Sequence, residues 1–141
     1  MARLFVDTWG WLAVRDRGER QHQAAVTVFN GAQVAGGGIV TTDYVLDEAF
    51  TLLFRRLALH KAEESVAALL AAIDEGSVSL AAITPTRFAE AVKLRMKYGD
   101  RPEISFTDFT SMVVMRELGL KRVLTEDGHF AQVGLGFELV P

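Results

Sequence analysis

The chain lacks cysteine and has no long apolar run. Its 141 residues include no cysteine, which excludes a disulfide framework, a zinc–thiolate site, an iron–sulfur cluster and a thiol nucleophile. The longest apolar stretch, Val66–Ile73, is much shorter than the ~20 residues that a membrane-spanning helix needs. Asp7 also interrupts the N-terminal apolar run before a signal-peptide core can form. We therefore expect a cytoplasmic protein with no membrane partner.

Several common active-site motifs are missing as well. The three histidines, His22, His60 and His129, lack the His-x-x-x-His or His-Glu-x-x-His spacing of zinc sites. There is no Gly-x-x-x-x-Gly-Lys phosphate loop and no Gly-x-Ser-x-Gly nucleophile elbow. The glycines at 36–38 precede a predicted strand, whereas a dinucleotide-binding fingerprint follows one. These absences argue against a nucleotide-binding loop and against a serine hydrolase.

The composition indicates an ordered protein of one domain, which we assign to residues 1–141. Half of the residues are hydrophobic and 23% are charged, which provides a sizeable core and argues against disorder. The 15 basic and 18 acidic side chains give a formal charge of −3. Taken alone, that balance disfavours nucleic acid as a partner.

Short apolar runs alternate with helical periodicity along the chain. This alternation predicts a single-domain α/β fold with three layers, α/β/α, around a mostly parallel sheet. The predicted strands are 4–6, 38–42, 78–83, 103–106, 122–124 and 137–140, and the predicted helices are 20–33, 43–59, 62–73, 86–98 and 107–118. The run Ala35–Gly38 is predicted to be a turn.

Acidic residues follow the predicted strands. Asp7 follows the first strand, Asp43 the second, Asp108 the fourth and Asp127 the fifth. In a parallel sheet these strand ends meet at one edge, where clustered carboxylates would repel one another. A divalent cation relieves this repulsion, and all-oxygen ligands without cysteine favour Mg²⁺ or Mn²⁺.

A purely structural interpretation exists for each acid alone. Acidic side chains in the first turn of a helix complement its dipole. Ser105, Thr107 and Asp108 are also consistent with a helix cap, and Asp127 with Gly128 is consistent with a turn. The coincidence of four acids at successive strand ends, each near Ser or Thr, favours the metal site.

Four sequence blocks resemble the PIN-domain ribonucleases, and among them the VapC-type toxins. The blocks are Leu4-Phe5-Val6-Asp7-Thr8, Thr41-Thr42-Asp43-Tyr44-Val45-Leu46-Asp47-Glu48, Ser105-Phe106-Thr107-Asp108 and Leu124-Thr125-Glu126-Asp127-Gly128-His129-Phe130. The resemblance spans almost the whole chain. It implies a PIN-like fold and a Mg²⁺- or Mn²⁺-dependent endoribonuclease that leaves a 5′-phosphate and a 3′-hydroxyl.

The resemblance also implies a ligand set and partners. The metal ligands and catalytic acids it implies are Asp7, Glu48, Asp108 and Asp127. Helical phase does not by itself choose among Asp43, Asp47 and Glu48, and Glu126 is an open auxiliary candidate. Thr8, Thr107 and Thr125 are candidates for orienting a carboxylate or a water. RNA is the implied substrate, a cognate antitoxin the implied partner, and a homodimer the implied assembly.

Basic and aromatic residues offer candidate RNA contacts. The basic clusters are Arg15, Arg17 and Arg20; Arg55 and Arg56; and Arg87, Lys93, Arg95 and Lys97. Trp9 and Trp11 could stack on a base, although we favour core or dimer packing for both. Removing four ligand charges from −3 leaves +1, so the acidic balance is compatible with an enzyme that cuts nucleic acid once a cation is bound.

Three other functions remain open from the sequence. A housekeeping RNA-processing nuclease would share the fold and the acids. A non-catalytic domain that binds a cation and a partner would be expected to lack one of the acids. A phosphatase with Asp7 as nucleophile usually has a second Asp two residues later, where this chain has Trp9.

Overall fold

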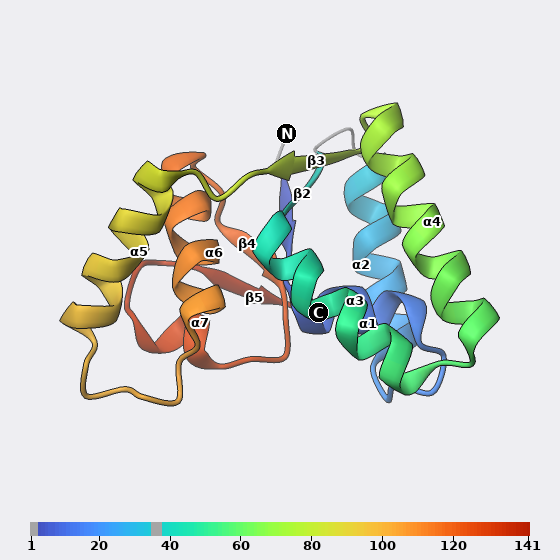
Figure 1. Cartoon of the computed structure of the whole chain (residues 1–141), viewed down its shortest axis with the longest axis horizontal. Coiled ribbons are helices and arrows are strands. Elements are labelled where there is room, and N and C mark those ends of the chain that lie inside the picture. The colour runs from blue at the N-terminus through green and yellow to red at the C-terminus, as the bar shows by residue number, and fades with distance from the viewer. Residues whose placement is uncertain (1–2, 35–37) are drawn as a thin grey trace.

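A computed structural model describes residues 3–34 and 38–141 and shows a five-stranded sheet between layers of helices (Figure 1). The elements in chain order are β1 (Leu4–Val6), α1 (Thr8–Arg15), α2 (His22–Val34), β2 (Ile39–Thr42), α3 (Asp43–Arg56), α4 (Leu59–Glu75), β3 (Val78–Ala81), α5 (Pro85–Lys97), α6 (Phe106–Glu117), β4 (Arg122–Leu124), α7 (His129–Gln132) and β5 (Glu138–Val140). The predicted turn at 35–38 lies mostly outside the described residues.

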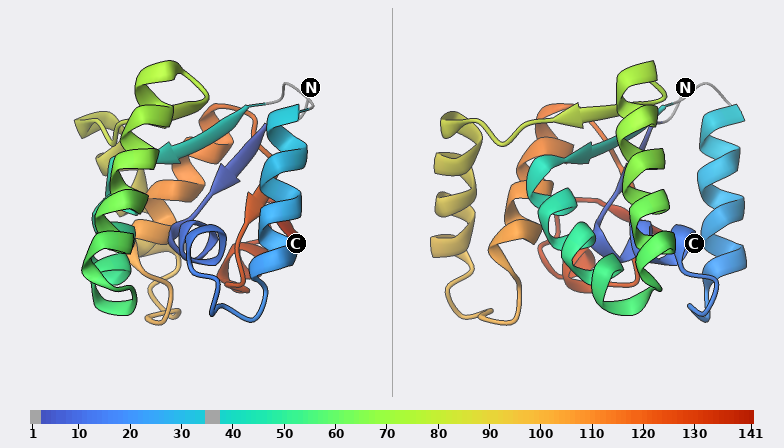
Figure 2. Two further views of the ribbon diagram at one scale, coloured as in Figure 1. Left: turned by 90° about the vertical axis from the view of Figure 1, so that its right-hand side faces the viewer. Right: turned by 45° about the vertical axis from the view of Figure 1, so that its right-hand side comes forward.

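The sheet has the strand order β3-β2-β1-β4-β5, and every neighbouring pair is parallel. Helices α2 and α4 cover one face, and α5 and α6 cover the other (Figure 2). All three residues of the central strand β1 are fully buried, as expected for a strand covered on both faces. The predicted three-layer α/β/α architecture is confirmed.

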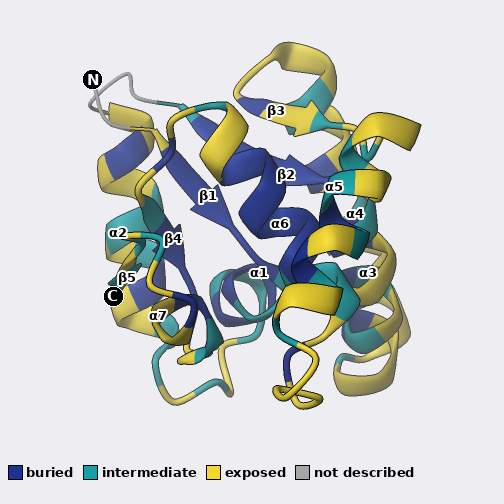
Figure 3. Cartoon of the chain, turned by 90° about the vertical axis from the view of Figure 1, so that its left-hand side faces the viewer, coloured by how far each residue is buried: buried dark blue, intermediate teal, exposed yellow. Residues whose placement is uncertain are grey.

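Helix α6 is the most buried helix among the described residues. Every residue of Phe109–Met115 is buried, and the helix lies over β1 and β2 with α5 packed beside it (Figure 3). A helix that is apolar on all sides is stable only when protein surrounds it. The first turn of α6, which carries Asp108, is therefore attached to an immobile part of the core.

The predicted strand at 103–106 is wrong. Ser105 instead caps α6, since its hydroxyl accepts a hydrogen bond of 3.0 Å from the backbone N–H of Asp108. The guanidinium of Arg95 donates to the carbonyls of Ile104, Tyr98 and Arg101. Within the segment, Arg95 satisfies the carbonyl of Ile104, and the backbone N–H of Phe109 satisfies that of Ser105, without a neighbouring strand. Buried Ile104 accounts for the strand-like sequence.

Two helices, α1 and α7, were not predicted. Helix α1 begins immediately after Asp7 and contains Trp11, which is buried and donates from Nε1 to the hydroxyl of Thr41 at 3.0 Å. Trp11 therefore packs in the core, as favoured above, whereas Trp9 is half-buried. The remaining helices and strands agree with the predicted ones to within a few residues. None of the helices in the described parts of the chain is long and apolar enough to cross a membrane.

Gly10 allows α1 to pack tightly against the sheet. A Cβ atom at this position would lie 2.6 Å from the carbonyl oxygen of Leu124 and 2.8 Å from Cγ1 of Val6. Contacts this short require the backbone to move. The close approach places the N-terminus of α1 directly over the ends of β1 and β4.

We predict that Gly10→Ala lowers the free energy of unfolding by ~2–3 kcal/mol, because overpacking displaces α1 from the sheet. Gly31→Ala is the matched control, since Gly31 lies within α2 and an added Cβ meets nothing within 4 Å. That control should gain ~0.5–1 kcal/mol from helix propensity. Urea denaturation of both variants measures the difference, and equal stabilities would contradict the packing argument.

Candidate metal centre

The carboxyl group of Asp7 is buried at the end of β1, where it caps α1. Its Oδ1 accepts a hydrogen bond of 2.9 Å from the backbone N–H of Gly10, and the side chain of Thr125 donates to Oδ2. Only 5% of Asp7 is exposed. The N-cap role follows from the extended backbone of Asp7 next to a helical segment. Asp7 is thus a structural cap, and it lies where the sequence predicts a metal ligand.

The turn after β4 brings a second acid to the same place. Val6 and Leu124 are paired in the sheet, so the residues that follow them lie side by side. The hydroxyl of Thr125 accepts a hydrogen bond of 2.9 Å from the backbone N–H of Asp127. Oδ1 of Asp127 accepts one of 2.9 Å from the backbone N–H of His129. These local bonds fix the direction of the Asp127 side chain.

Asp108 enters the site from the first turn of α6. His129 links it to Asp127, because Nδ1 lies 3.3 Å from Oδ2 of Asp108 and 2.8 Å from Oδ1 of Asp127. One ligand atom from each of these three side chains lies within 4.8 Å of the other two. Side chains from α6 and from the turn after β4 therefore converge on one small volume.

Burial and, second to it, neighbouring negative charge raise the pKa values of two of the acids, Asp7 and Asp108. Burial raises the pKa of Asp7 to about 7, and the negative charges of Asp108 and Asp127 add to the rise, against the hydrogen bonds from Thr125 and Gly10. Burial, followed by the charge of Asp127, raises the pKa of Asp108 to about 6, and His129 opposes that rise. Strongly perturbed carboxyl groups in one cluster are typical of a functional site.

The donor set fits a hard divalent cation. Carboxylate oxygens are the preferred ligands of Mg²⁺ and Mn²⁺, and positive charge placed here would relieve both the burial cost and the mutual repulsion. Asp7, Asp108 and Asp127 lie close enough for their charges to interact. The structure thus contains a candidate acidic metal site at the predicted edge of the sheet.

Glu48 is not among the three side chains whose ligand atoms lie within 4.8 Å of one another. It is exposed on the second turn of α3, a helix that starts directly after β2, the strand next to β1. Thr42 caps α3 by accepting a hydrogen bond of 3.0 Å from the backbone N–H of Val45. Glu48 therefore sits near the same sheet edge, and its role as a ligand stays a prediction.

The open candidates Asp43, Asp47 and Glu126 are all exposed. Oδ1 of Asp43 accepts a hydrogen bond of 2.8 Å from the backbone N–H of Ile83, which ties α3 to the segment after β3.

The three threonines occupy different environments. Thr125 is buried and contacts Asp7, whereas Thr8 and Thr107 are half-buried on the first turns of α1 and α6. Oγ1 of Thr125 both donates to Asp7 and accepts from Asp127, so it couples the two acids.

His129 is the residue that sequence reasoning set aside. It fits no zinc-binding spacing, because its partners Asp108 and Asp127 reach it through tertiary structure and a tight turn. The only signal in the sequence was its place two residues after an acid at a strand end.

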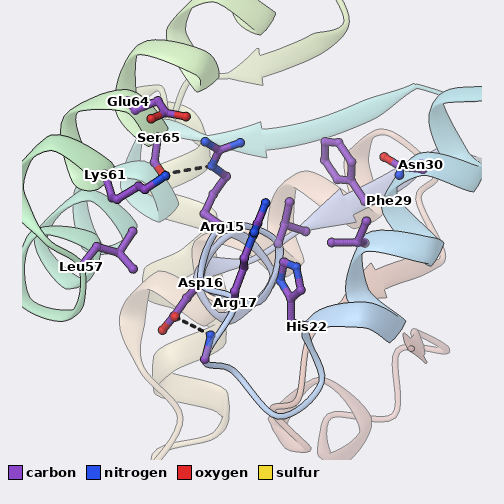
Figure 4. A pocket seen from close by; sticks show the side chains of 13 residues that line it. Arg15, Asp16, Arg17, His22, Phe29, Asn30, Leu57, Lys61, Glu64 and Ser65 are labelled. Atoms are coloured by element: carbon purple, nitrogen blue, oxygen red, sulfur yellow. Dashed lines mark hydrogen bonds between the residues drawn. The ribbon is translucent and has the colours of Figure 1, made fainter.

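A cavity of about 640 Å³ lies elsewhere, between the end of α1, α2 and the start of α4 (Figure 4). None of the four predicted ligands lines it. Arg15 and Arg17, from the first predicted basic cluster, are in its wall, and Arg15 donates to the hydroxyl of Ser65 at 3.0 Å. The cavity is therefore distinct from the acidic cluster.

Much of the other predicted basic surface has structural partners. Arg87 pairs with Glu117 at 2.6 Å, and Lys93 pairs with Glu90 at 3.1 Å. Arg95 bonds to backbone carbonyls, as described above. These contacts give Arg87 and Arg95 structural roles, whereas Lys93 and Lys97 are exposed.

Comparisons with known proteins agree with this architecture. The sequence model of the PIN-domain family matches residues 4–135 of this chain. The 23S rRNA-specific endonuclease VapC20 of Mycobacterium tuberculosis strain H37Rv is 30% identical over 131 residues, which cover 93% of this chain and 94% of the relative. The crystal structure of M. tuberculosis VapC20, described as a sarcin–ricin loop cleaving toxin, superposes with a TM-score of 0.83 over 98% of this chain and 99% of that one.

A more distant structure supports the fold alone. The VapBC2 complex of Rickettsia felis, bound to a DNA fragment from its promoter, contains a chain with 10% identity and a TM-score of 0.75 over 99% of both chains.

We predict that the metal-free protein loses stability relative to Asp7→Asn as the pH rises from about 4 to about 7. The folded state holds the Asp7 proton more tightly than the unfolded chain, in which the pKa is the ordinary 3.8. Raising the pH therefore ionises a group that the fold prefers neutral. At ~1.4 kcal/mol per pKa unit, the loss amounts to at most roughly 4 kcal/mol.

Urea denaturation in the presence of a chelator, at the two ends of this pH range, measures the effect. Asp74→Asn, at an exposed position near the end of α4, is the control and should follow the wild type. A stability difference between wild type and Asp7→Asn that does not change with pH would contradict the buried-carboxyl argument.

Proposed function

Because this chain belongs to the PIN-domain family, we propose that it is a metal-dependent endoribonuclease whose ligands for Mg²⁺ or Mn²⁺ are Asp7, Glu48, Asp108 and Asp127. The observation that carries the proposal is the convergence of Asp7, Asp108 and Asp127 at the carboxyl edge of the sheet, where burial and neighbouring negative charge raise the pKa values of Asp7 and Asp108. No sequence motif or described cluster points as directly to other chemistry. We take residues 1–141 as the catalytic domain.

The ion, when bound, supplies electrostatic stabilisation of the phosphate charge and a more acidic water for in-line attack. Other residues of the chain hold the proposed ligands in place. Asp108 is fixed by the capped first turn of α6, and Asp127 by its bonds within the turn after β4. The hydroxyl of Thr125 orients Oδ2 of Asp7. Each Asp7 oxygen accepts one bond here and retains a second lone pair for a ligand.

Ribosomal RNA is the first substrate to test. The M. tuberculosis relative, 30% identical over most of the chain, is a 23S rRNA-specific endonuclease, and VapC20 is a toxin that cleaves the sarcin–ricin loop. RNA phosphates need cationic side chains besides the ion. Arg15 and Arg17 are the candidates, with Lys61 beside them in the cavity wall. A cytoplasmic location is consistent with this substrate.

We further propose that the protein is the toxin of a toxin–antitoxin pair and forms a homodimer. Its structural neighbours include a chain from the VapBC2 complex of R. felis. Exposed apolar side chains, among them Phe54, Leu59 and Phe88, offer surface for protein contacts. A housekeeping nuclease of the same fold is the alternative.

Growth arrest on expression of the wild type, but not of Asp108→Asn, would favour the toxin, whereas harmless expression of the wild type would favour the housekeeping nuclease.

We predict that Asp108→Asn lowers cleavage of a sarcin–ricin loop RNA by ~100-fold or more, since loss of even an outer partner of a metal ligand costs ~10–100-fold. The assay compares wild type and variant with Mg²⁺ or Mn²⁺, and with a chelator. Asp74→Asn is the matched control and should cleave normally. Undiminished cleavage by Asp108→Asn, or cleavage by the wild type in chelator, would contradict the carboxylate–metal mechanism. RNA binding without any cleavage would favour a non-catalytic binding domain.

A second prediction separates the exposed acids of α3. Glu48→Gln should lower cleavage by ~10–100-fold if Glu48 completes the ligand set, whereas the neighbouring Asp47→Asn should have a much smaller effect. Both residues are exposed on the same helix, so their charge changes are matched. A larger loss for Asp47→Asn would move the ligand assignment to Asp47.

A further inference from the structure

His129 directs one ring nitrogen at two acids from different parts of the fold. Nδ1 is 3.3 Å from Oδ2 of Asp108 in α6 and 2.8 Å from Oδ1 of Asp127 in the turn after β4. The imidazole side chain is 23% exposed, and those of Asp108 and Asp127 are 15% and 30% exposed. The nitrogen thus lies inside the group of atoms that could hold a cation.

The backbone holds His129 in this position. It is the first residue of α7, and its N–H donates to Oδ1 of Asp127 at 2.9 Å. The next residue, Phe130, is fully buried and anchors the short helix to the core, in edge contact with Phe137. The imidazole therefore belongs to the same rigid turn as Asp127.

We propose that Nδ1 of His129 is a ligand of the ion held by Asp108 and Asp127, and that this nitrogen gives the site a preference for Mn²⁺ over Mg²⁺. The inference rests on the proposed function and names a ligand beyond the four acids. Its basis is the placement of Nδ1 together with two carboxylate oxygens, all within 4.8 Å of one another. A cation bonded to three donors at ~2.1–2.3 Å brings the donors to mutual distances of this order.

The preference follows from the chemistry of the donors. Mg²⁺ demands oxygen ligands and usually keeps several waters. Imidazole suits the later divalent metals better, and Mn²⁺ accepts both oxygen and nitrogen. A site with one imidazole among its carboxylates should therefore bind Mn²⁺ more tightly than a site made of the acids alone.

A different role for the same contacts is to orient the acids. In that role His129 orients the two carboxylates by hydrogen bonding and does not contact the ion. The two roles differ in one observable, because only a ligand places nitrogen in the coordination sphere of the bound metal.

Electron spin-echo spectroscopy of Mn²⁺-loaded protein tests the proposal. The wild type should show modulation from a coordinated imidazole ¹⁴N, and protein labelled with ¹⁵N-histidine should replace that pattern with one from ¹⁵N. His129→Gln should lose it, whereas His60→Gln, at an exposed position on α4, should retain it. The labelled wild type needs no substitution, so the result does not depend on the folding of the variant.

Competition binding gives an independent measurement. The ratio of Mg²⁺ to Mn²⁺ affinities, measured by displacement of Mn²⁺ with Mg²⁺, should shift toward Mg²⁺ by ~10-fold in His129→Gln and remain unchanged in His60→Gln. Bound Mn²⁺ without nitrogen modulation in the wild type would overturn the proposal. RNA cleavage would in that case continue, so the proposed function would stand. Absence of any Mn²⁺ binding, together with cleavage in chelator, would overturn both.

Discussion

The structure depends on a buried carboxyl group at the end of its central strand. Asp7 follows a fully buried strand, caps α1 through Gly10 and accepts a hydrogen bond from Thr125. These contacts join β1, α1 and the turn after β4 at one point. The close approach at Gly10 holds the same junction. The remainder of the acidic cluster is arranged around this position.

The helix caps also position the acids of the candidate site. Thr42 and Ser105 satisfy the N–H groups at the starts of α3 and α6, as Asp7 does for α1. By fixing those first turns, the caps determine where the acids on them point. The raised pKa values of Asp7 and Asp108 mean that ionising these carboxyl groups lowers the stability of the cation-free fold. Such a loss of stability is common where side chains are held in place for function. The net charge of −3 therefore reflects the site and does not exclude an RNA partner.

The sequence predicts most of the fold because short apolar runs alternate with helical periodicity along the chain. Helix α1 was missed because it is only eight residues long and contains Gly10, a residue that disfavours helix in isolation. The false strand at 103–106 arose because the segment contains buried Ile104, while its hydrogen bonds come from Arg95 and from the first turn of α6 and not from a neighbouring strand. The clustering of Asp7, Asp108 and Asp127 was predictable from their places after the strands, and their role as ligands stays a prediction. The contact between His129 and Asp108 was not predictable, since α6 and the turn after β4 meet only in three dimensions.

The burial of α6 has a consequence for how such a site can change. Asp108 is followed immediately by Phe109–Met115, all enclosed by protein, so this helix can neither slide nor turn without opening the core. Asp127 and His129 lie instead on a short turn around Gly128, which is exposed and where an added Cβ would meet nothing within 4 Å. Substitutions that adapt the site to another ion or substrate are therefore expected in the turn, because they can move Asp127 and His129 there. The position of Asp108 on α6 would stay unchanged.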